Sequence, residues 1–156
     1  MGNRLPFHPA FPVANLGATR DFFTENLGCR VRQENDRWID FDFFGHQVTA
    51  HPSDAIAPLV ANEVDGKPEP LSHVGLMLGR QQWHVLAERL RQQDVTFRIA
   101  ACLRFRGQVG EQATLFTQGP SRNAIDFQCF REPSRLLQRS RRVDTRRALT
   151  GLESGD

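Results

Sequence analysis

Apolar and polar positions follow the same succession of periods in two stretches of the chain. Residues 7–13 alternate and predict a short strand, and the helical segment that follows them is bounded by Asn15 as a cap and Gly28 as a stop. Its apolar stripe consists of Leu16, Phe23 and Leu27. Three more strands are predicted at residues 30–34, 38–44 and 46–51.

The same order returns after a proline-rich stretch at residues 52–70, which predicts a loop with a turn at Asp65-Gly66. Residues 72–78 alternate, and residues 81–93 carry apolar side chains at helical spacing. Three further strands are predicted at 96–105, 112–117 and 124–130. A unit written twice predicts two modules related by a pseudo-twofold axis, with equivalent positions facing each other.

Composition is that of one folded domain. The chain has 156 residues, of which 39% are apolar and 24% charged, so a wholly disordered protein is excluded. No apolar run has the ~20 residues that a membrane helix needs, and the first residues lack the apolar core of a secretory signal. The three cysteines form no CxxC pair, which indicates free thiols in a reducing cytoplasm.

Charge is distributed unevenly. The net charge is +2, and six arginines lie in residues 133–156 among few large apolar residues. One interpretation of this segment is a solvated, flexible tail. The other is a basic arm for a partner or a nucleic acid, which the absence of aromatic residues in the arm disfavours because bases stack on aromatic rings.

Candidate chemistry lies on the strands. His8 and His73 occupy the same place in the two copies, 65 residues apart, and each shares its strand face with a small residue. The last strand places Asp126 and Gln128 on one face. Two histidines and one carboxylate with open positions form the facial triad of divalent metals, so these side chains are expected to converge on an ion.

Several of these residues have ordinary alternatives. A strand carboxylate such as Asp126 is also found as an edge charge, and His51 is interpreted as a fourth ligand, a catalytic base or a surface group. Arg104 either holds an anionic substrate group or lies at the surface. Asp40 and Asp42 share a strand face, which is interpreted as an acid–base pair, as a solvated strand face or as a salt bridge to Arg37.

Four stretches carry a resemblance to a known family: residues 8–16, residues 22–28, His73-Val74-Gly75 and residues 119–127. Over roughly residues 5–132 the chain resembles the vicinal oxygen chelate superfamily, which includes glyoxalase I, bleomycin-resistance proteins, fosfomycin-resistance enzymes and extradiol dioxygenases. The resemblance implies an α+β fold in which two βαβββ modules, at about 5–53 and 71–132, form an open cup-shaped mixed barrel flanked by helices.

The resemblance also implies a site. Carried over to this sequence, its metal ligands are His8, His73 and Asp126, with Thr49 at the position of a fourth ligand. Thr49 is not the glutamate of glyoxalase I, and Asp126 is one methylene shorter than the usual glutamate. The chain has no tyrosine, whereas extradiol dioxygenases use one, so ordinary catechol cleavage is disfavoured.

These observations predict a metal-dependent enzyme that acts on a small, vicinally oxygenated molecule. The divalent ion (Fe, Mn, Zn or Ni) acts as a Lewis acid or as a centre for O2 chemistry. His51 moves a proton, and the substrate-binding candidates are Thr49, Arg104 and Gln128. We expect a cytoplasmic homodimer with no membrane partner. The alternatives are a metal-free small-molecule binding protein of the bleomycin-resistance kind and an interaction protein that acts through its basic tail.

Overall fold

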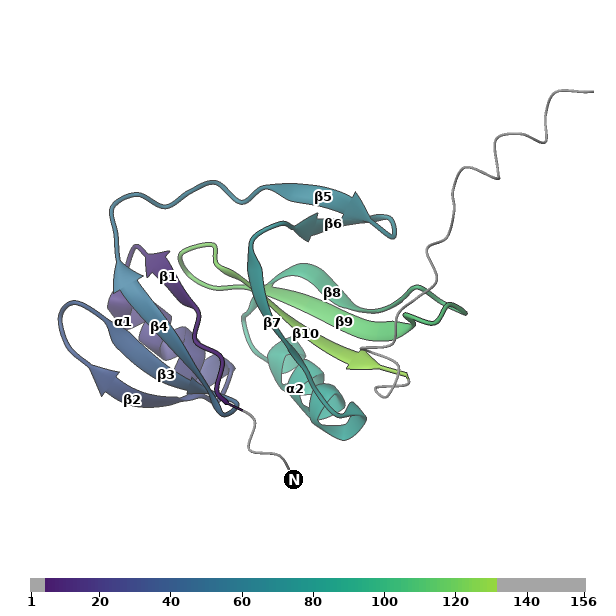
Figure 1. Ribbon diagram of the computed structural model, residues 1–156, viewed down its shortest axis with the longest axis horizontal. Helices are drawn as coiled ribbons and strands as arrows, with labels where there is room; N and C mark the ends of the chain where they lie inside the picture. Colours follow the sequence, from purple (N-terminus) through teal and green to yellow (C-terminus); the bar gives the residue numbers. More distant parts are fainter. Residues whose placement is uncertain (1–4, 132–156) are drawn as a thin grey trace, which may run out of the picture.

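The computed structural model describes residues 5–131 and consists of two modules with the same order of elements (Figure 1). The first contains β1 (Ala10–Val13), α1 (Leu16–Asp21), a π-helical turn η1 (Phe22–Asn26), β2 (Arg30–Glu34), β3 (Ile39–Phe43) and β4 (His46–Pro52). The second contains β7 (His73–Met77), α2 (Arg80–Gln92), β8 (Thr96–Arg104), β9 (Gln112–Gln118) and β10 (Ala124–Phe130). The basic segment at 133–156 lies outside the described residues.

Both modules form a mixed sheet with the same strand order. The orders are β1-β4-β3-β2 and β7-β10-β9-β8. β1 pairs with β4, and β7 with β10, in parallel, whereas the other neighbouring strands are antiparallel. This arrangement confirms the predicted α+β class and the internal duplication. Within residues 5–131 the two four-stranded sheets are separate, with no strand pairing between them.

Local signals in the sequence explain the first helix. The Asn15 side chain accepts a hydrogen bond from the backbone N–H of Ala18 at 2.8 Å, which satisfies one of the free donors at the helix start. The helix continues through η1 and is followed by Gly28 at φ +74°, the left-handed conformation that glycine adopts at low cost. Both bounds are as the sequence predicts.

The proline-rich stretch at residues 52–70 is where the prediction of a loop was wrong. It contains a hairpin of β5 (Ala61–Val64) and β6 (Lys67–Pro70), joined at the predicted turn. Asp65 and Gly66 both have positive φ, as a two-residue hairpin turn requires. Pro68 and Pro70 are tolerated because each strand of a two-stranded ribbon pairs on one side only.

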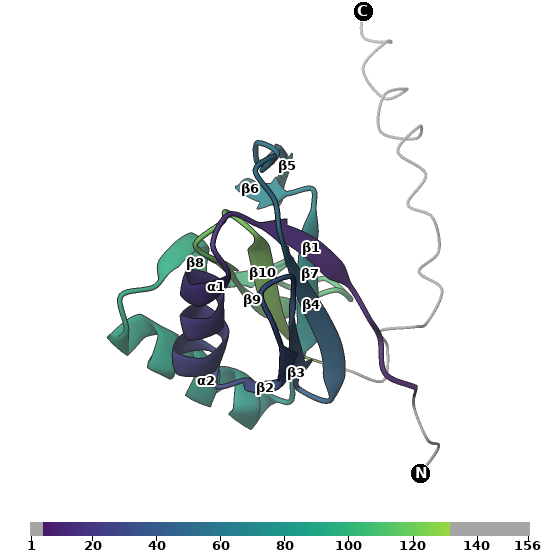
Figure 2. The same ribbon diagram turned by 90° about the vertical axis from the view of Figure 1, so that its left-hand side faces the viewer.

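The helices lie on the same side of the two sheets (Figure 2), and one apolar core runs beneath both. Phe23 of η1 stacks on Phe41 of β3, with ring centroids 4.4 Å apart. Phe43 of the first module contacts Phe127 of the second, with ring centroids 6.1 Å apart. The buried indole of Trp83 donates a hydrogen bond to the backbone carbonyl of Phe127 at 2.9 Å. Helix packing thus fills one face of each sheet and leaves the opposite faces for polar side chains.

Neither α1 nor α2, nor any other helix within residues 5–131, combines the length and the apolar character of a transmembrane helix.

Candidate functional site

The face of the second sheet that points away from α2 carries a buried carboxylate. Asp126 of β10 lies directly opposite Gly75 of β7 in the parallel register, and only 3% of Asp126 is exposed. A Cβ at position 75 would collide with the Asp126 carboxylate, so this side chain lies across the glycine. Gln128 donates from Nε2 to Oδ2 of Asp126 at 2.7 Å and fixes the carboxylate from the other side.

Burial raises the pKa of Asp126 above its usual range, because the ionised form has lost its water. The nearby His73 and the hydrogen bond from Gln128 act in the opposite direction, and the carboxylate of Glu69 raises the pKa further. A carboxylate in this setting is stabilised in its charged form by any added cation.

His73 is held by a backbone carbonyl. Its Nδ1 lies 2.6 Å from the carbonyl oxygen of Pro70. A carbonyl oxygen only accepts, so Nδ1 carries the hydrogen and Nε2 keeps its lone pair in the neutral imidazole. The ring also packs edge-on against Phe116, with centroids 5.1 Å apart. A hollow of about 220 Å³ opens here and is lined by His73, Gly75, Leu76, Met77, Asp126 and Gln128.

His8 belongs to a separate polar chain in the first module. Its Nε2 lies 2.8 Å from the hydroxyl of Thr49, and that hydroxyl donates to Oδ1 of Asp40 at 2.5 Å. Because the Thr49 hydrogen is committed to Asp40, the oxygen accepts from His8, which leaves the lone pair of the neutral ring on Nδ1. Thr49 and Asp40 are direct cross-strand partners on β4 and β3.

The expected convergence of all three ligands is not found within one chain. Among residues 5–131, no three His, Cys, Asp or Glu side chains come close enough to hold one ion. His73 and Asp126 lie together, whereas His8 lies with Thr49. Strand alternation fixes which face a side chain occupies within a sheet, but it does not fix how two separate sheets face each other. His51 is exposed on β4.

Arg104 is neither at the surface nor open to the solvent. It is 1% exposed, and its guanidinium donates from Nη1 to Oε2 of Glu69 at 2.6 Å and from Nη2 to the carbonyl of Val64 at 2.7 Å. Both acceptors lie on the β5–β6 hairpin. The hairpin, which the sequence did not predict, therefore supplies both hydrogen-bond acceptors of the buried Arg104 guanidinium.

Glu69 is the side chain near the site that sequence reasoning missed, and Asp40 has a different partner from the predicted ones. Asp40 bonds to Thr49, whereas Asp42 accepts from the backbone N–H of Gly45 and lies 3.6 Å from Arg30. The role of Asp40 follows from the strand register, which the sequence does not give. Glu69 lies in the stretch that the sequence predicts to be a loop, so no strand pattern pointed to it.

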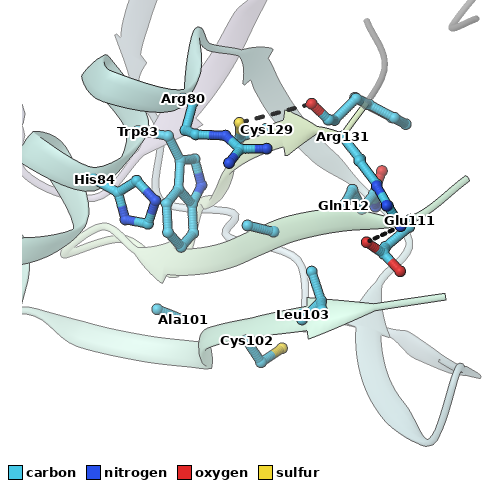
Figure 3. Close-up of a pocket in the computed structure, with 12 residues that line it drawn as sticks. Arg80, Trp83, His84, Ala101, Cys102, Leu103, Glu111, Gln112, Cys129 and Arg131 are labelled. Atoms are coloured by element: carbon cyan, nitrogen blue, oxygen red, sulfur yellow. Dashed lines mark hydrogen bonds and ion pairs between the residues drawn. The ribbon is translucent and has the colours of Figure 1, made fainter. Parts of the chain in front are cut away.

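A larger cavity than the hollow beside His73 lies elsewhere in the described chain (Figure 3). It has a volume of about 490 Å³ and lies between the start of α2 and the ends of β8, β9 and β10. Trp83 and Cys129 line its wall, and Arg80 and Arg131 are among its polar side chains. Cys129 shares its strand face with the core residue Phe127, so this cavity opens on the helix side of the sheet. It is lined by none of the predicted site residues.

No family model and no curated protein matches the chain. A glyoxalase/bleomycin resistance protein/dioxygenase from Alicyclobacillus acidocaldarius is 28% identical, with a TM-score of 0.72 over 85% of this chain and 95% of that one. The fosfomycin resistance protein FosX from Listeria monocytogenes is 14% identical, with a TM-score of 0.61 over 83% and 94%. FosX from Mesorhizobium loti is 15% identical, with a TM-score of 0.59 over 87% and 99%.

These structures confirm the resemblance to the vicinal oxygen chelate superfamily that the sequence indicated. The fold is that of glyoxalase-like proteins, and the match covers nearly the whole of each neighbour.

Proposed function

We propose that this protein is a metal-dependent enzyme that acts on a small molecule with adjacent oxygen atoms, as glyoxalase/dioxygenase-like proteins do. The observation that carries the proposal is that His73, whose Nε2 is free to bind a cation, and the desolvated carboxylate of Asp126 line the same hollow. A FosX structure with the same fold was solved with Mn(II) and a dihydroxypropylphosphonic acid, which supports this class of ligand for the fold.

The donors present fit part of a divalent metal site. One imidazole and one carboxylate are ligands that Fe, Mn, Zn and Ni accept, and the glycine at position 75 makes room for the carboxylate. The third expected donor, His8, lies in the other module. We therefore propose that the site is completed in a homodimer, with His73 and Asp126 from one subunit and His8 of the partner subunit.

The unpaired edges of β1 and β7 support a homodimer. β1 and β7 are the outer strands of their sheets, so each keeps one unpaired edge in the described chain. Met77 on β7 is 57% exposed, and Phe7, just before β1, is 68% exposed. Unpaired edges flanked by exposed apolar side chains are typical of surfaces that associate.

The chain's own residues then have distinct tasks. A divalent ion bound here supplies Lewis-acid chemistry to the vicinal oxygens of the substrate. Gln128 orients the Asp126 carboxylate, and Thr49 with Asp40 fixes the tautomer of His8. His51 is exposed on β4 and is our candidate for moving a proton.

A metal-free binding protein of the bleomycin-resistance kind is the second candidate. The observation in its favour is that no complete metal-ligand set assembles within residues 5–131. The two candidates differ in whether the protein holds an ion.

Metal content decides between them. The native protein, His8→Ala, His73→Ala and the control His84→Ala are stripped with a chelator, reloaded and analysed by mass spectrometry. His84 lies on α2 beside Trp83 and away from the site, so its variant should retain the native content. We expect about one ion per native chain and a loss of at least tenfold in affinity for the two site variants. Equal content in all four proteins contradicts the enzyme and favours the binding protein.

Mixing the variants tests the dimer. If the ligands come from two subunits, a heterodimer of His8→Ala and His73→Ala has one intact site and one site that lacks both histidines. Refolding the two variants together should therefore restore metal binding in proportion to the heterodimer formed. If each site lies within one chain, the mixture binds no more than the separate variants.

A further inference from the structure

The β5–β6 hairpin lies against the second sheet beside the candidate site (Figure 1). Four polar contacts hold it there. Glu69 and the carbonyl of Val64 both accept from Arg104, Asp65 accepts from the backbone N–H of Phe105 at 3.0 Å, and the carbonyl of Pro70 accepts from His73. The hairpin therefore connects Arg104 to the same histidine that we propose as a metal ligand.

Beneath the hairpin, buried polar side chains gather on the face of the second sheet that points away from α2. Arg104 on β8 lies directly opposite Gln112 on β9, and Thr114 follows two residues later on the same face. All three are at least nine-tenths buried. Thr114 in turn lies opposite Gln128 of β10, so this cluster continues into the face that carries Asp126.

Two polar atoms of the cluster lack partners. Within the described part of the chain, neither Nε of Arg104 nor the hydroxyl of Thr114 has a hydrogen-bond partner. Leaving a buried donor unpaired costs about 1–3 kcal/mol, so such atoms are rare in folded proteins and call for an explanation. A bound ligand with acceptor atoms would satisfy them.

Glu69 shows which kind of group the Arg104 guanidinium binds. Its carboxylate reaches in from the hairpin and sits on the guanidinium at 2.6 Å, the short distance of a charge-assisted hydrogen bond. Glu69 remains 24% exposed, whereas Arg104 is 1% exposed, so the carboxylate is at the open side of the pair. A two-stranded ribbon is marginally stable by itself, which makes this carboxylate displaceable.

We propose that Arg104, Gln112 and Thr114 form the subsite for a carboxylate group of the substrate, and that Glu69 occupies this subsite until the substrate carboxylate displaces it. The inference rests on the proposed function, because the subsite adjoins the Asp126 face and defines the substrate class as a small carboxylic acid. Binding requires the hairpin to move, since Arg104 is covered while Glu69 is in place.

If Glu69 occupies the subsite, it competes with any carboxylate that binds from solution and lowers the apparent affinity for that carboxylate. A tethered group has an effective concentration in the millimolar range or above, so a free carboxylate must displace it at that disadvantage. Removing the charge of Glu69 should therefore raise the affinity for a small carboxylate by about tenfold or more, without raising the affinity for an uncharged molecule of the same shape.

The test uses benzoate and its neutral isostere benzamide, titrated calorimetrically into the full chain without added metal. The proteins are the native chain, Glu69→Gln, Arg104→Gln and the control Glu63→Gln. Glu63→Gln removes the same charge from an exposed position of the same hairpin. We expect benzoate to bind Glu69→Gln about tenfold more tightly than the native chain or the control, and Arg104→Gln to bind it no better than benzamide. No binding of benzoate to Glu69→Gln, or an equal gain for benzamide, overturns the proposal.

A second measurement needs no variant. Benzoate at saturation should accelerate amide hydrogen exchange at residues 61–70 of the native chain, because it releases Glu69, whereas benzamide should not. Unchanged or slower exchange of the hairpin with benzoate overturns the proposal even where Glu69→Gln fails to fold. Neither readout involves metal, so a failure of the metal assay and a failure of this subsite are distinguishable.

Discussion

Gly75 and Asp126 lie side by side on β7 and β10, and the carboxylate occupies the space that any larger residue at position 75 would fill. The glycine is thus required by a close approach between strands, since its own backbone is not in the left-handed region.

The first prediction follows from this contact. Gly75→Ala should destabilise the protein by about 1–3 kcal/mol, because the added methyl group forces the buried carboxylate out of place. Thermal unfolding measures the change. Gly110→Ala is the control, since a Cβ at Gly110 meets no atom within 4 Å. A native stability for Gly75→Ala would contradict the described position of Asp126.

Two threonines of β9 provide a matched pair. Both are fully buried, but the hydroxyl of Thr117 donates to the carbonyl of Ile125 at 3.2 Å, whereas that of Thr114 has no partner in residues 5–131. Thr117→Val should cost about 1 kcal/mol. Thr114→Val should be neutral or stabilising by about 1 kcal/mol, because the replacement removes an unpaired polar group without changing its shape. Chemical denaturation compares them, and equal losses would show that Thr114 has a hidden partner.

The Arg104–Glu69 pair predicts an asymmetry between its partners. Glu69→Ala leaves an almost fully buried guanidinium without its counter-charge, which should cost about 3–5 kcal/mol. Arg104→Met leaves a carboxylate that can turn toward solvent, so its cost should be about half as large. Denaturant unfolding of both variants checks the order, and the reverse order would indicate that Glu69 is the more buried charge.

The thiols should differ in reactivity. Burial, with a smaller contribution from Asp42, raises the pKa of Cys29 to about 12, so this thiol stays protonated at pH 8. Cys129 is buried as well, and Cys102 is partly exposed. In the native protein a thiol reagent such as Ellman's reagent should react first with Cys102, and all three should react in denaturant. Equal rates for the three thiols in the folded protein would be inconsistent with this packing.

Much of the fold was predictable because it depends on local signals. The alternation of β2, β4, β7 and β10, the cap at Asn15 and the stop at Gly28 are properties of neighbouring residues. The two copies reinforced each other, since the same order of elements appeared twice. The hairpin at residues 61–70 was not predicted, because its strands are short and polar and contain prolines.

The candidate site was predictable in part. Strand alternation assigned His73 and Asp126 to the polar faces of their strands, whereas the neighbouring positions of β7 and β10 in one sheet come from the structure. The role of Glu69 could not be foreseen, because it depends on where the hairpin lies in space.

The sequence by itself determined the duplicated βαβββ order and the face of each strand on which the polar residues lie, because both follow from the period of side chains along the backbone. Only the tertiary structure decided that His73 and Asp126 line one hollow, that His8 lies with Thr49, and that Arg104 is covered by Glu69. These relationships join residues 35 to 53 positions apart. They depend on strand register and on how separate elements pack, which no local pattern encodes.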